Sequence, residues 1–325
     1  MAKLLFVVHR YYPFPGGSEY YVQAMAEEAY SRGHDVSVLA GEHQGDQNGI
    51  KVTNDANVLL QHWDLIIVHG AGVSVQDFVL SNARQIPNPI LYMIILPEER
   101  PVHIKALQDC RYIGWSTHED MEFIIKHNAL DKAVNVRHGI KHNESIGKAG
   151  FKQKYNIQGP MFLSCGGYWP NKAMKELAFL FKKANLPDAV LVTTGYDNRN
   201  NLMPDASPNV IPLLIEDKDD VLSAILEADC YLMHSYVEGF GLVLLESMLN
   251  ETPWIARHGS GARLLEDYGR TYTSNEELIA LLQNFNTLKW DLDRAKNHIL
   301  NNHLIANTID DIEKILQTEI KKSEG

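Results

Sequence analysis

Short apolar runs alternate along the chain with longer stretches in which apolar residues recur every three or four positions. Leu4 to Val8 is a continuous apolar run bounded by polar residues, which is typical of a strand buried on both faces of a parallel sheet. Ser18 to Arg32 has helical spacing, and Gly33 is a suitable helix stop. This alternation predicts an α/β fold with parallel sheets.

The alternation restarts after a polar stretch from Lys141 to Gly159 that is rich in glycine and lysine. We place an interdomain linker at the start of this stretch, which gives an N-terminal domain over residues 1–141 and a C-terminal domain over residues 142–303. Buried strands are predicted at 36–40, 65–68, 90–96, 112–115 and 133–137 in the first domain, and at 161–164, 189–193, 210–214 and 230–233 in the second.

The end of the chain changes character, because three helical segments follow one another at residues 276–285, 290–300 and 308–320. In the last segment Ile309, Ile312, Ile315 and Leu316 share one face, opposite charged residues. An amphipathic helix needs a surface to pack against. We therefore expect the C-terminal helix, residues 304–325, to pack back on the first domain.

Composition and charge argue against several classes of protein. The 325 residues are 45% hydrophobic and 22% charged, which fits two globular domains. A formal net charge of −11 argues against a surface built mainly to bind nucleic acid. The first apolar run is too short for a signal peptide and no run is long enough to cross a bilayer, so neither a leader nor a transmembrane segment is expected.

Cysteine and histidine spacing predicts no metal site and no cofactor. Cys110, Cys165 and Cys230 stand far apart beside apolar or aromatic residues, which indicates buried, reduced thiols and a cytoplasmic location. The fourteen histidines show no ligand spacing. The pair Asp291 and Asp293 lies in a charged helical segment and is expected to be solvated.

The densest chemical signal is the segment His234-Ser-Tyr-Val-Glu-Gly-Phe-Gly-Leu-Val-Leu-Leu-Glu246, which follows a predicted strand. Gly239 and Gly241 keep Glu238 out of a regular helix, so we expect this acid on a loop at the strand's carboxyl end. Glu246 falls in an otherwise apolar helix, where an unpaired carboxylate is costly. This favours a functional role over a surface charge.

The same segment has the parts of a site for a nucleotide sugar. Gly239, Phe240 and Gly241 let backbone amides approach a phosphate or sugar oxygen, and the start of the following helix adds a partial positive charge. A carboxylate on the loop can accept hydrogen bonds from sugar hydroxyls. A carboxylate inside the helix can bind both hydroxyls of a ribose.

Two glutamates separated by seven residues, with Gly-Phe-Gly after the first, resemble the signature of the large retaining family 4 of nucleotide-sugar glycosyltransferases. The resemblance implies the GT-B architecture, in which two Rossmann-like domains face each other across a cleft. It implies that Glu238 contacts the transferred sugar and Glu246 the donor ribose. The amides around Phe240, Gly241 and Leu242 would hold the sugar and the diphosphate.

A second match is the turn Gly166-Gly167 followed by Lys172, after the first strand of the second domain. In the family a lysine at this place binds the donor diphosphate, so the resemblance implies that Lys172 neutralises charge as the glycosidic bond breaks. The family often carries an arginine in the turn, where this chain has Gly166 or Gly167. Another cation must substitute for it, or the leaving group is held less tightly.

A third match is Pro15-Gly-Gly-Ser-Glu19, between the first strand and the first helix. In the family this loop faces the donor diphosphate and the acceptor, which makes Gly17 a donor-binding candidate and Gly16 and Ser18 acceptor-side candidates. The glycine spacing of a dinucleotide fingerprint is absent, which argues against an NAD-dependent dehydrogenase.

The chain departs from the family after the strand predicted at 90–96. Many members carry a sugar-contacting histidine there, whereas this sequence has Leu96-Pro-Glu-Glu99. His69 and His118 are candidates for that role by their loop positions, and Glu98 is a further acceptor-side candidate.

Together these features predict a metal-independent retaining hexosyl- or pentosyltransferase that uses a UDP- or GDP-sugar, with Glu238 and Lys172 catalytic. Two alternatives stay open: a nucleotide-sugar epimerase of GT-B fold, and a non-catalytic nucleotide-sugar-binding protein. The acceptor is equally open among glycans, lipid-linked sugars, small molecules and modified bases. Nucleic acid is expected as a partner only if it carries such an acceptor. Any membrane contact is expected to be peripheral.

Overall fold

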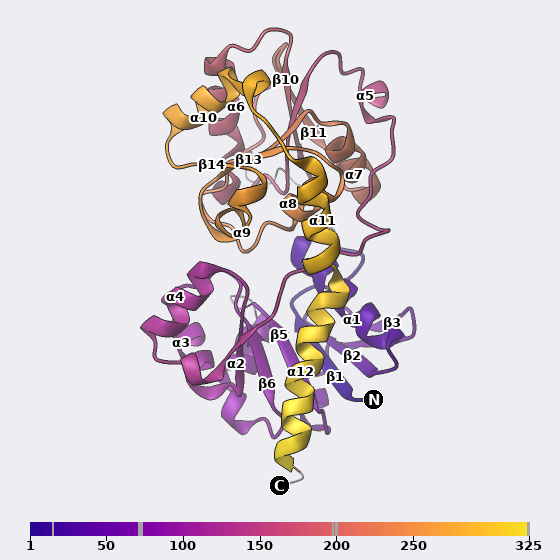
Figure 1. The fold of residues 1–325 in the computed structure, drawn as a ribbon. Helices are drawn as coiled ribbons and strands as arrows, with labels where there is room; N and C mark the ends of the chain where they lie inside the picture. Colours follow the sequence, from indigo (N-terminus) through magenta and orange to yellow (C-terminus); the bar gives the residue numbers. More distant parts are fainter. Residues whose placement is uncertain (15, 71–73, 197, 199–200, 324–325) are drawn as a thin grey trace. The chain divides into compact units, whose positions relative to one another are not determined.

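A computed structural model of the chain describes residues 1–14, 16–70, 74–196, 198 and 201–323. They divide into two compact units, one made of Met1–Lys141 with Asn302–Gly325 and the other of His142–Asn301. In Figure 1 the first unit runs from indigo to magenta and includes the yellow C-terminal helix.

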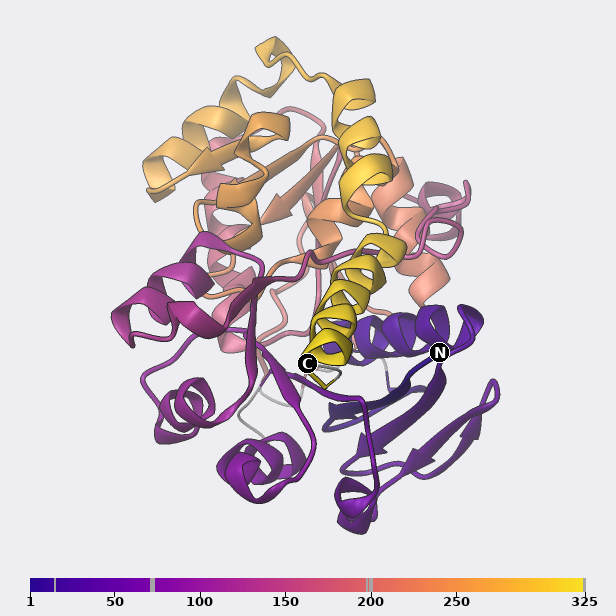
Figure 2. The same cartoon turned by 60° about the horizontal axis from the view of Figure 1, so that its bottom comes forward.

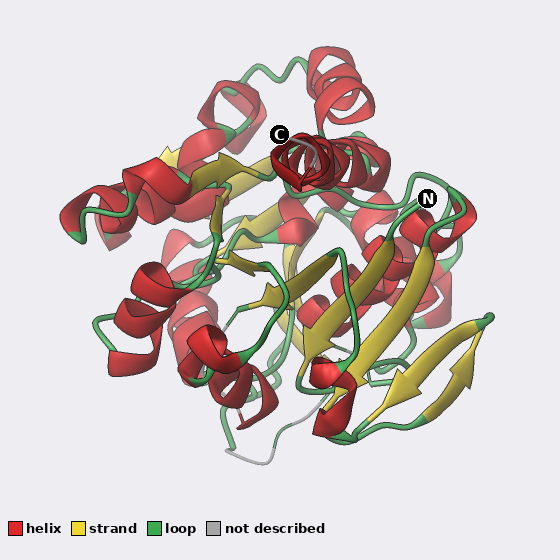
Figure 3. Ribbon diagram, turned by 90° about the horizontal axis from the view of Figure 1, so that it is seen from below, coloured by secondary structure: helices red, strands yellow, loops and turns green. Residues whose placement is uncertain are grey.

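The first unit is built on an eight-stranded sheet with the order β3-β4-β2-β1-β5-β6-β7-β8, counted over the described residues. Its neighbouring strands are parallel except in the β3–β4 hairpin. Figure 3 shows this strand layer with helices on both sides. The strands are β1 (Lys3–Val8), β2 (Asp35–Ala40), β3 (Gly45–Gln47), β4 (Ile50–Thr53), β5 (Leu65–His69), β6 (Ile90–Met93), β7 (Tyr112–Trp115) and β8 (Ala133–Asn135).

The helices of the first unit follow local signals in the sequence. Thr117 and Asp120 form a capping box at the start of α4. Gly33, with φ of 85°, lies in the left-handed region just after α1 and ends it as predicted. The helices are α1 (Gly17–Ser31), α2 (Ser74–Ser81), α3 (Pro101–Asp109), α4 (His118–Lys126) and α12 (Ile305–Ser323).

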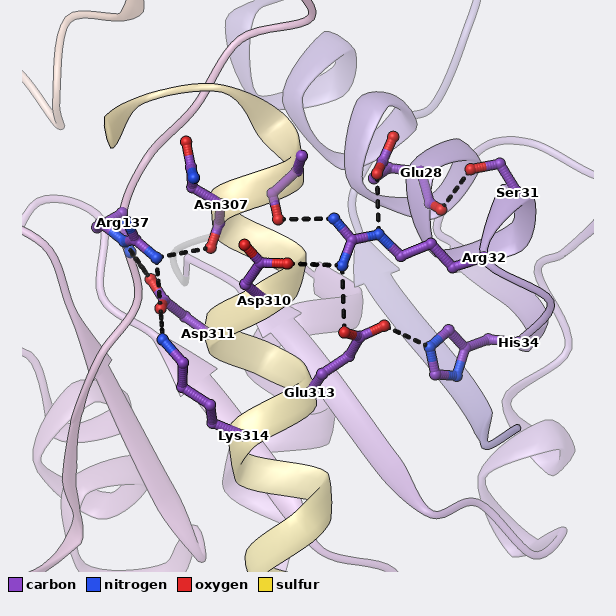
Figure 4. A network of polar contacts seen from close by, with 11 residues as sticks. Glu28, Ser31, Arg32, His34, Arg137, Asn307, Asp310, Asp311, Glu313 and Lys314 are labelled. Atoms are coloured by element: carbon purple, nitrogen blue, oxygen red, sulfur yellow. Dashed lines mark hydrogen bonds and ion pairs between the residues drawn. The ribbon is translucent and has the colours of Figure 1, made fainter. Parts of the chain in front are cut away.

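The C-terminal helix α12 packs beside α1 within the first unit (Figure 2). Its apolar face is buried at Ile309, Ile312, Ile315 and Leu316. Ionic hydrogen bonds flank this face on both sides (Figure 4). Arg32 donates to Asp310 at 2.8 Å and to Glu313 at 3.1 Å. Arg137 donates to Asp311 at 2.7 and 2.8 Å.

The second unit contains a six-stranded sheet with the order β11-β10-β9-β12-β13-β14, parallel throughout its described strands. The strands are β9 (Met161–Cys165), β10 (Val190–Gly195), β11 (Val210–Leu214), β12 (Cys230–Met233), β13 (Trp254–Arg257) and β14 (Arg270–Tyr272). The helices are α5 (Phe151–Lys154), α6 (Met174–Ala184), α7 (Lys218–Glu227), α8 (Leu242–Leu249), α9 (Ser260–Leu264), α10 (Asn275–Gln283) and α11 (Leu292–Asn302).

The predicted α/β fold with two parallel-sheet domains is confirmed, with differences at strand ends. Strands β6 and β8 stop earlier than predicted, and Leu96 adopts a left-handed backbone with φ of 58°. The β3–β4 hairpin was not predicted, because its first strand is short and polar.

All three cysteines are buried free thiols, as expected. Among the described residues, no helix is long and apolar enough to cross a membrane.

Candidate functional site

Both predicted donor segments lie at one place in the second sheet. From β9 the chain moves outward to β10 and β11, then returns to β12 on the other side of β9. In open parallel sheets, ligands bind outside the carboxyl ends of the strands at such a topological switch point. The turn Gly166-Gly167 follows β9, and the loop that carries Glu238 follows β12. The fold therefore brings the two segments to the edge where a ligand is expected.

Lys172 and Glu238 contact each other at this edge. The Lys172 ammonium forms an ion pair and a hydrogen bond with Oε2 of Glu238, a residue 66 positions further along the chain. Their side chains are 21% and 19% exposed, so both remain within reach of a ligand. A cation and an anion stand side by side where the sequence predicts a diphosphate and a sugar.

The Glu238 loop is fastened at several points. Asn171 accepts a hydrogen bond from the Tyr236 amide at 2.8 Å and donates one to the Val237 carbonyl at 3.0 Å. On the other side, the Ser260 hydroxyl donates to the Glu238 carbonyl at 2.6 Å. These bonds fix the loop backbone, so the position of the Glu238 carboxylate depends on few rotatable bonds.

Backbone amide groups are available beside this ion pair. Gly241 has φ of 85° and precedes the first residue of α8, a conformation that favours glycine. The amides of Gly241, Leu242 and Val243 make no hydrogen bond to any described residue. Free amides at a helix start, together with the helix dipole, attract anions. Gly166 has φ of 136°, which favours glycine, and a Cβ at this position would lie 3.4 Å from Cε of Lys172.

Glu246 lies in the second turn of α8 and is half-buried. Its carboxylate has no hydrogen-bond partner among the described residues, although its backbone carbonyl accepts from Asn250. Burial raises the pKa of Glu246, against a lowering influence of Lys218. A half-buried acceptor without a donor suits a ligand that supplies hydroxyl groups.

A cluster of side chains around the buried His234 lies behind the Glu238 loop, and no sequence pattern predicts it. His234 follows β12, and its Nδ1 lies 2.5 Å from the Tyr272 hydroxyl while its Nε2 lies 3.2 Å from Arg257. Burial and the neighbouring Arg257 lower the pKa of His234 to about 4, so the ring is neutral. Tyr236, two residues before Glu238, donates to Glu176 at 2.6 Å. The cluster therefore anchors the start of the loop, a role that no local motif indicates.

The first sheet has its own switch point between β1 and β5, and a cavity of about 300 Å³ lies there. Ser18, His69 and Glu98 line it, so the structure brings three of the acceptor-side candidates together. Gly16 precedes α1 and is buried, whereas His118 is exposed at the first residue of α4 and does not line the cavity.

The glycine loop of the first unit surrounds a buried acid. Gly17 is the first residue of α1 and is exposed, and Pro15 lies outside the described residues. A Cβ on Gly16 would lie 2.0 Å from Oε2 of Glu19, so a larger residue there would have to displace the Glu19 carboxylate. Burial raises the pKa of Glu19, although Arg10 at 3.4 Å opposes this shift. Glu19 is part of the predicted motif, but the motif alone indicates no role for it.

The described residues contain no group of three or more histidine, cysteine or acidic side chains placed to hold a metal ion.

A sequence model of the family described as "Glycosyl transferases group 1" matches residues 147–272, which include the whole edge around Glu238. No curated protein sequence gives a significant match. Among solved structures, Anabaena Alr3699/HepE in complex with UDP-glucose is similar with a TM-score of 0.75 and 15% identity, covering 98% of this chain and 100% of that one.

Two further structures show the same likeness in fold. WaaG, a glycosyltransferase involved in lipopolysaccharide biosynthesis, has a TM-score of 0.70 and 18% identity, with 97% of this chain and 99% of that one covered. Trehalose-6-phosphate synthase OtsA has a TM-score of 0.75 and 12% identity, over 97% and 99%. Residues 147–272 are therefore similar to the glycosyl transferases group 1 family, and the whole chain has the two-domain α/β fold of GT-B glycosyltransferases.

Proposed function

We propose that this chain is a retaining, metal-independent glycosyltransferase that moves a sugar from a nucleotide-diphosphate sugar to an acceptor hydroxyl. The observation that carries the proposal is the ion pair of Lys172 with Glu238 beside the amides of Gly241, Leu242 and Val243, which bond to none of the described residues. A cation and free amides suit a diphosphate, and a carboxylate suits the hydroxyls of the attached sugar.

Donor binding exchanges partners within the site. In the proposal, Lys172 moves from Glu238 to the donor diphosphate, which frees the Glu238 carboxylate to accept hydrogen bonds from the sugar. The two ribose hydroxyls donate to Glu246, whose carboxylate has no partner among the described residues. The turn Gly166-Gly167 lacks side chains that would block the diphosphate.

The transfer step breaks the bond between the anomeric carbon and the diphosphate oxygen. The acceptor oxygen bonds to the same face of that carbon, so configuration is retained, and the leaving phosphate takes the acceptor proton. Lys172 and the start of α8 stabilise the charge that develops on the diphosphate. The acceptor is assigned to the first unit, where Ser18, His69 and Glu98 line the cavity.

The comparisons support the donor class. Anabaena Alr3699/HepE has been solved with UDP-glucose and also with UDP and glucose. The matched family is described as glycosyl transferases, and its match spans both acids and Lys172. These likenesses favour a nucleotide sugar as the donor.

A thermal-shift screen against UDP, GDP, ADP and their sugars tests the proposal, since a ligand that binds the folded state raises the melting temperature. We expect one nucleotide series to stabilise the protein, and Lys172→Ala to abolish that shift. The stabilising nucleotide sugar is then incubated alone and with mixed acceptors. Transfer with retention is expected. An epimerised sugar without acceptor would show an isomerase instead, and binding without turnover would show a non-catalytic protein.

A further inference from the structure

The cavity at the first switch point contains buried polar atoms that lack partners. Both ring nitrogens of His69, Oε1 of Gln76 and Nε2 of His103 are buried and make no hydrogen bond to any described residue. The three side chains are 4%, 5% and 1% exposed, and all line the same cavity. Native proteins rarely leave buried polar atoms unpaired, so several around one cavity point to a ligand that pairs them.

Neighbouring bonds hold these side chains in place. Gln76 donates from Nε2 to the His69 carbonyl at 3.0 Å, which leaves its Oε1 as the free acceptor. Nδ1 of His103 lies 2.9 Å from the Tyr92 hydroxyl, which leaves Nε2 as the free ring nitrogen. The polar atoms are thus pre-positioned, as in a built binding site.

The free atoms demand a ligand that both donates and accepts hydrogen bonds. Burial lowers the pKa of His69 to about 4 and, with help from Arg100, lowers the pKa of His103, so both rings are neutral. A neutral imidazole has one donor and one acceptor nitrogen, and Oε1 of Gln76 only accepts. An anion would leave the acceptors unpaired, and an apolar chain would leave all of them unpaired.

The charged groups at the cavity are balanced. Arg10 lies 3.4 Å from Glu19, and Arg100 lies 4.0 Å from Glu98. All four residues line the cavity, which therefore has no excess of either charge. A volume of about 300 Å³ lies at the lower end of the range for small-molecule sites.

We propose that this cavity binds a sugar ring through its hydroxyl groups, with Gln76, His69 and His103 as the residues that recognise them. The inference rests on the proposed function, and it names a carbohydrate as the ligand of the first unit. The ring belongs either to the acceptor or to the sugar of the donor, since both carry the same chemistry.

Two variants test the cavity, and one serves as a control. Ser18 is exposed and lines the cavity, so Ser18→Phe narrows its entrance without disturbing the core. Gln76→Met removes the free acceptor while roughly keeping the side-chain volume. Ser31→Phe makes the same change as Ser18→Phe at the other end of α1, also at an exposed position. Melting temperatures check that all three proteins fold.

The measurements separate the two sources of the ring. In one arm, saturation-transfer NMR follows methyl α-glycosides of glucose, galactose, mannose and N-acetylglucosamine. In the other arm, titration calorimetry compares UDP with UDP-sugars and GDP with GDP-sugars. We expect at least one methyl glycoside to bind, or one nucleotide sugar to bind more tightly than its nucleotide. Ser18→Phe and Gln76→Met should lower the affinity for that glycoside, or the affinity that the sugar adds to its nucleotide, at least tenfold. Ser31→Phe should change the same affinity less than twofold.

The outcomes for the cavity and for the proposed function are distinct. If no glycoside binds and no sugar adds affinity to its nucleotide, the cavity does not bind a sugar. The same conclusion follows if Ser18→Phe and Gln76→Met leave the affinity for the sugar unchanged. Nucleotide affinity itself should survive in Ser18→Phe, because Lys172, Glu246 and the amides at the start of α8, which the proposed function assigns to the nucleotide, belong to the other unit. Failure of all nucleotides to bind the unmodified protein would instead overturn the proposed function.

Discussion

Lys172 and Glu238 form an ion pair that joins the end of the turn after β9 to the loop after β12. In the proposed reaction this pair opens when the donor diphosphate takes over Lys172. We expect Lys172→Ala to lower kcat/KM about 100-fold to 1,000-fold, the range seen when one group that stabilises developing charge is removed. Steady-state kinetics measure this loss.

Lys175→Ala is the matched control, because Lys175 is exposed in the first turn of α6, three residues further on. It should change kcat/KM less than threefold. Equal losses in the two variants would mean that the general charge of this helix start, and not the contact with Glu238, governs activity.

Glu246 is assigned to the ribose of the donor. If its half-buried carboxylate accepts hydrogen bonds from both ribose hydroxyls, the protein should bind UDP or GDP more tightly than the 2′-deoxy form. Glu246→Gln should remove most of that preference, about tenfold for one charge-assisted hydrogen bond. Because burial raises the pKa of Glu246, the variant should also be no less stable than the unmodified protein.

Titration calorimetry with the ribose and deoxyribose nucleotides checks this assignment. Glu251→Gln, at an exposed position just beyond α8, serves as the control and should keep the preference. A preference that survives in Glu246→Gln would show that another group contacts the ribose.

Acid should destabilise the first unit through His69. Burial lowers the pKa of this ring from an ordinary value of 6.5 to about 4. Between these two pH values the unfolded chain binds a proton that the folded chain does not, so stability falls as pH falls through this window. The expected loss is about 3 kcal/mol for this one group.

Urea unfolding at pH 7, 6, 5 and 4 measures that loss, with His69→Asn as the comparison. The variant should lose less stability than the unmodified protein between pH 6.5 and 4. Parallel pH profiles of the two proteins would mean that His69 does not remain neutral in the folded state.

Arg137 and Asp311 fix the C-terminal helix to the first unit. Burial opposes ionisation of Asp311, but hydrogen bonds from Arg137 and Lys314 outweigh it and lower its pKa. Asp311→Asn should lower the free energy of unfolding by about 1–3 kcal/mol, because Arg137 would lose a charged partner. Asp310→Asn, on the more exposed side of the same helix, should cost less than about 1 kcal/mol.

Chemical denaturation monitored by circular dichroism compares the two variants. A loss at Asp310 as large as that at Asp311 would contradict the distinction between the exposed and the buried pair.

The candidate residues of the second unit could be named from the sequence, because they lie close together along the chain. Glu238, Gly239 and Gly241 are close neighbours, and their consequences for backbone conformation follow from residue type alone. The parallel fold then places the turn after β9 next to this loop. The ion pair itself was not predicted, since it depends on side-chain directions across 66 residues.

The cavity of the first unit could be predicted only in part. His69, Ser18 and Glu98 were chosen from their loop positions, but Gln76 and His103 carry no motif. They meet His69 only because β1, β5 and β6 are neighbours in the sheet and their loops converge. Whether a buried polar atom has a hydrogen-bond partner depends on three-dimensional packing, which a sequence pattern does not show.

A crystal structure of the protein grown with the nucleotide that raises its melting temperature most tests the central claim directly. The account predicts the diphosphate within hydrogen-bonding distance of Lys172 Nζ and of the Gly241 and Leu242 amides, with the ribose hydroxyls on Glu246. A nucleotide bound anywhere else, with the ion pair of Lys172 and Glu238 intact, would contradict it.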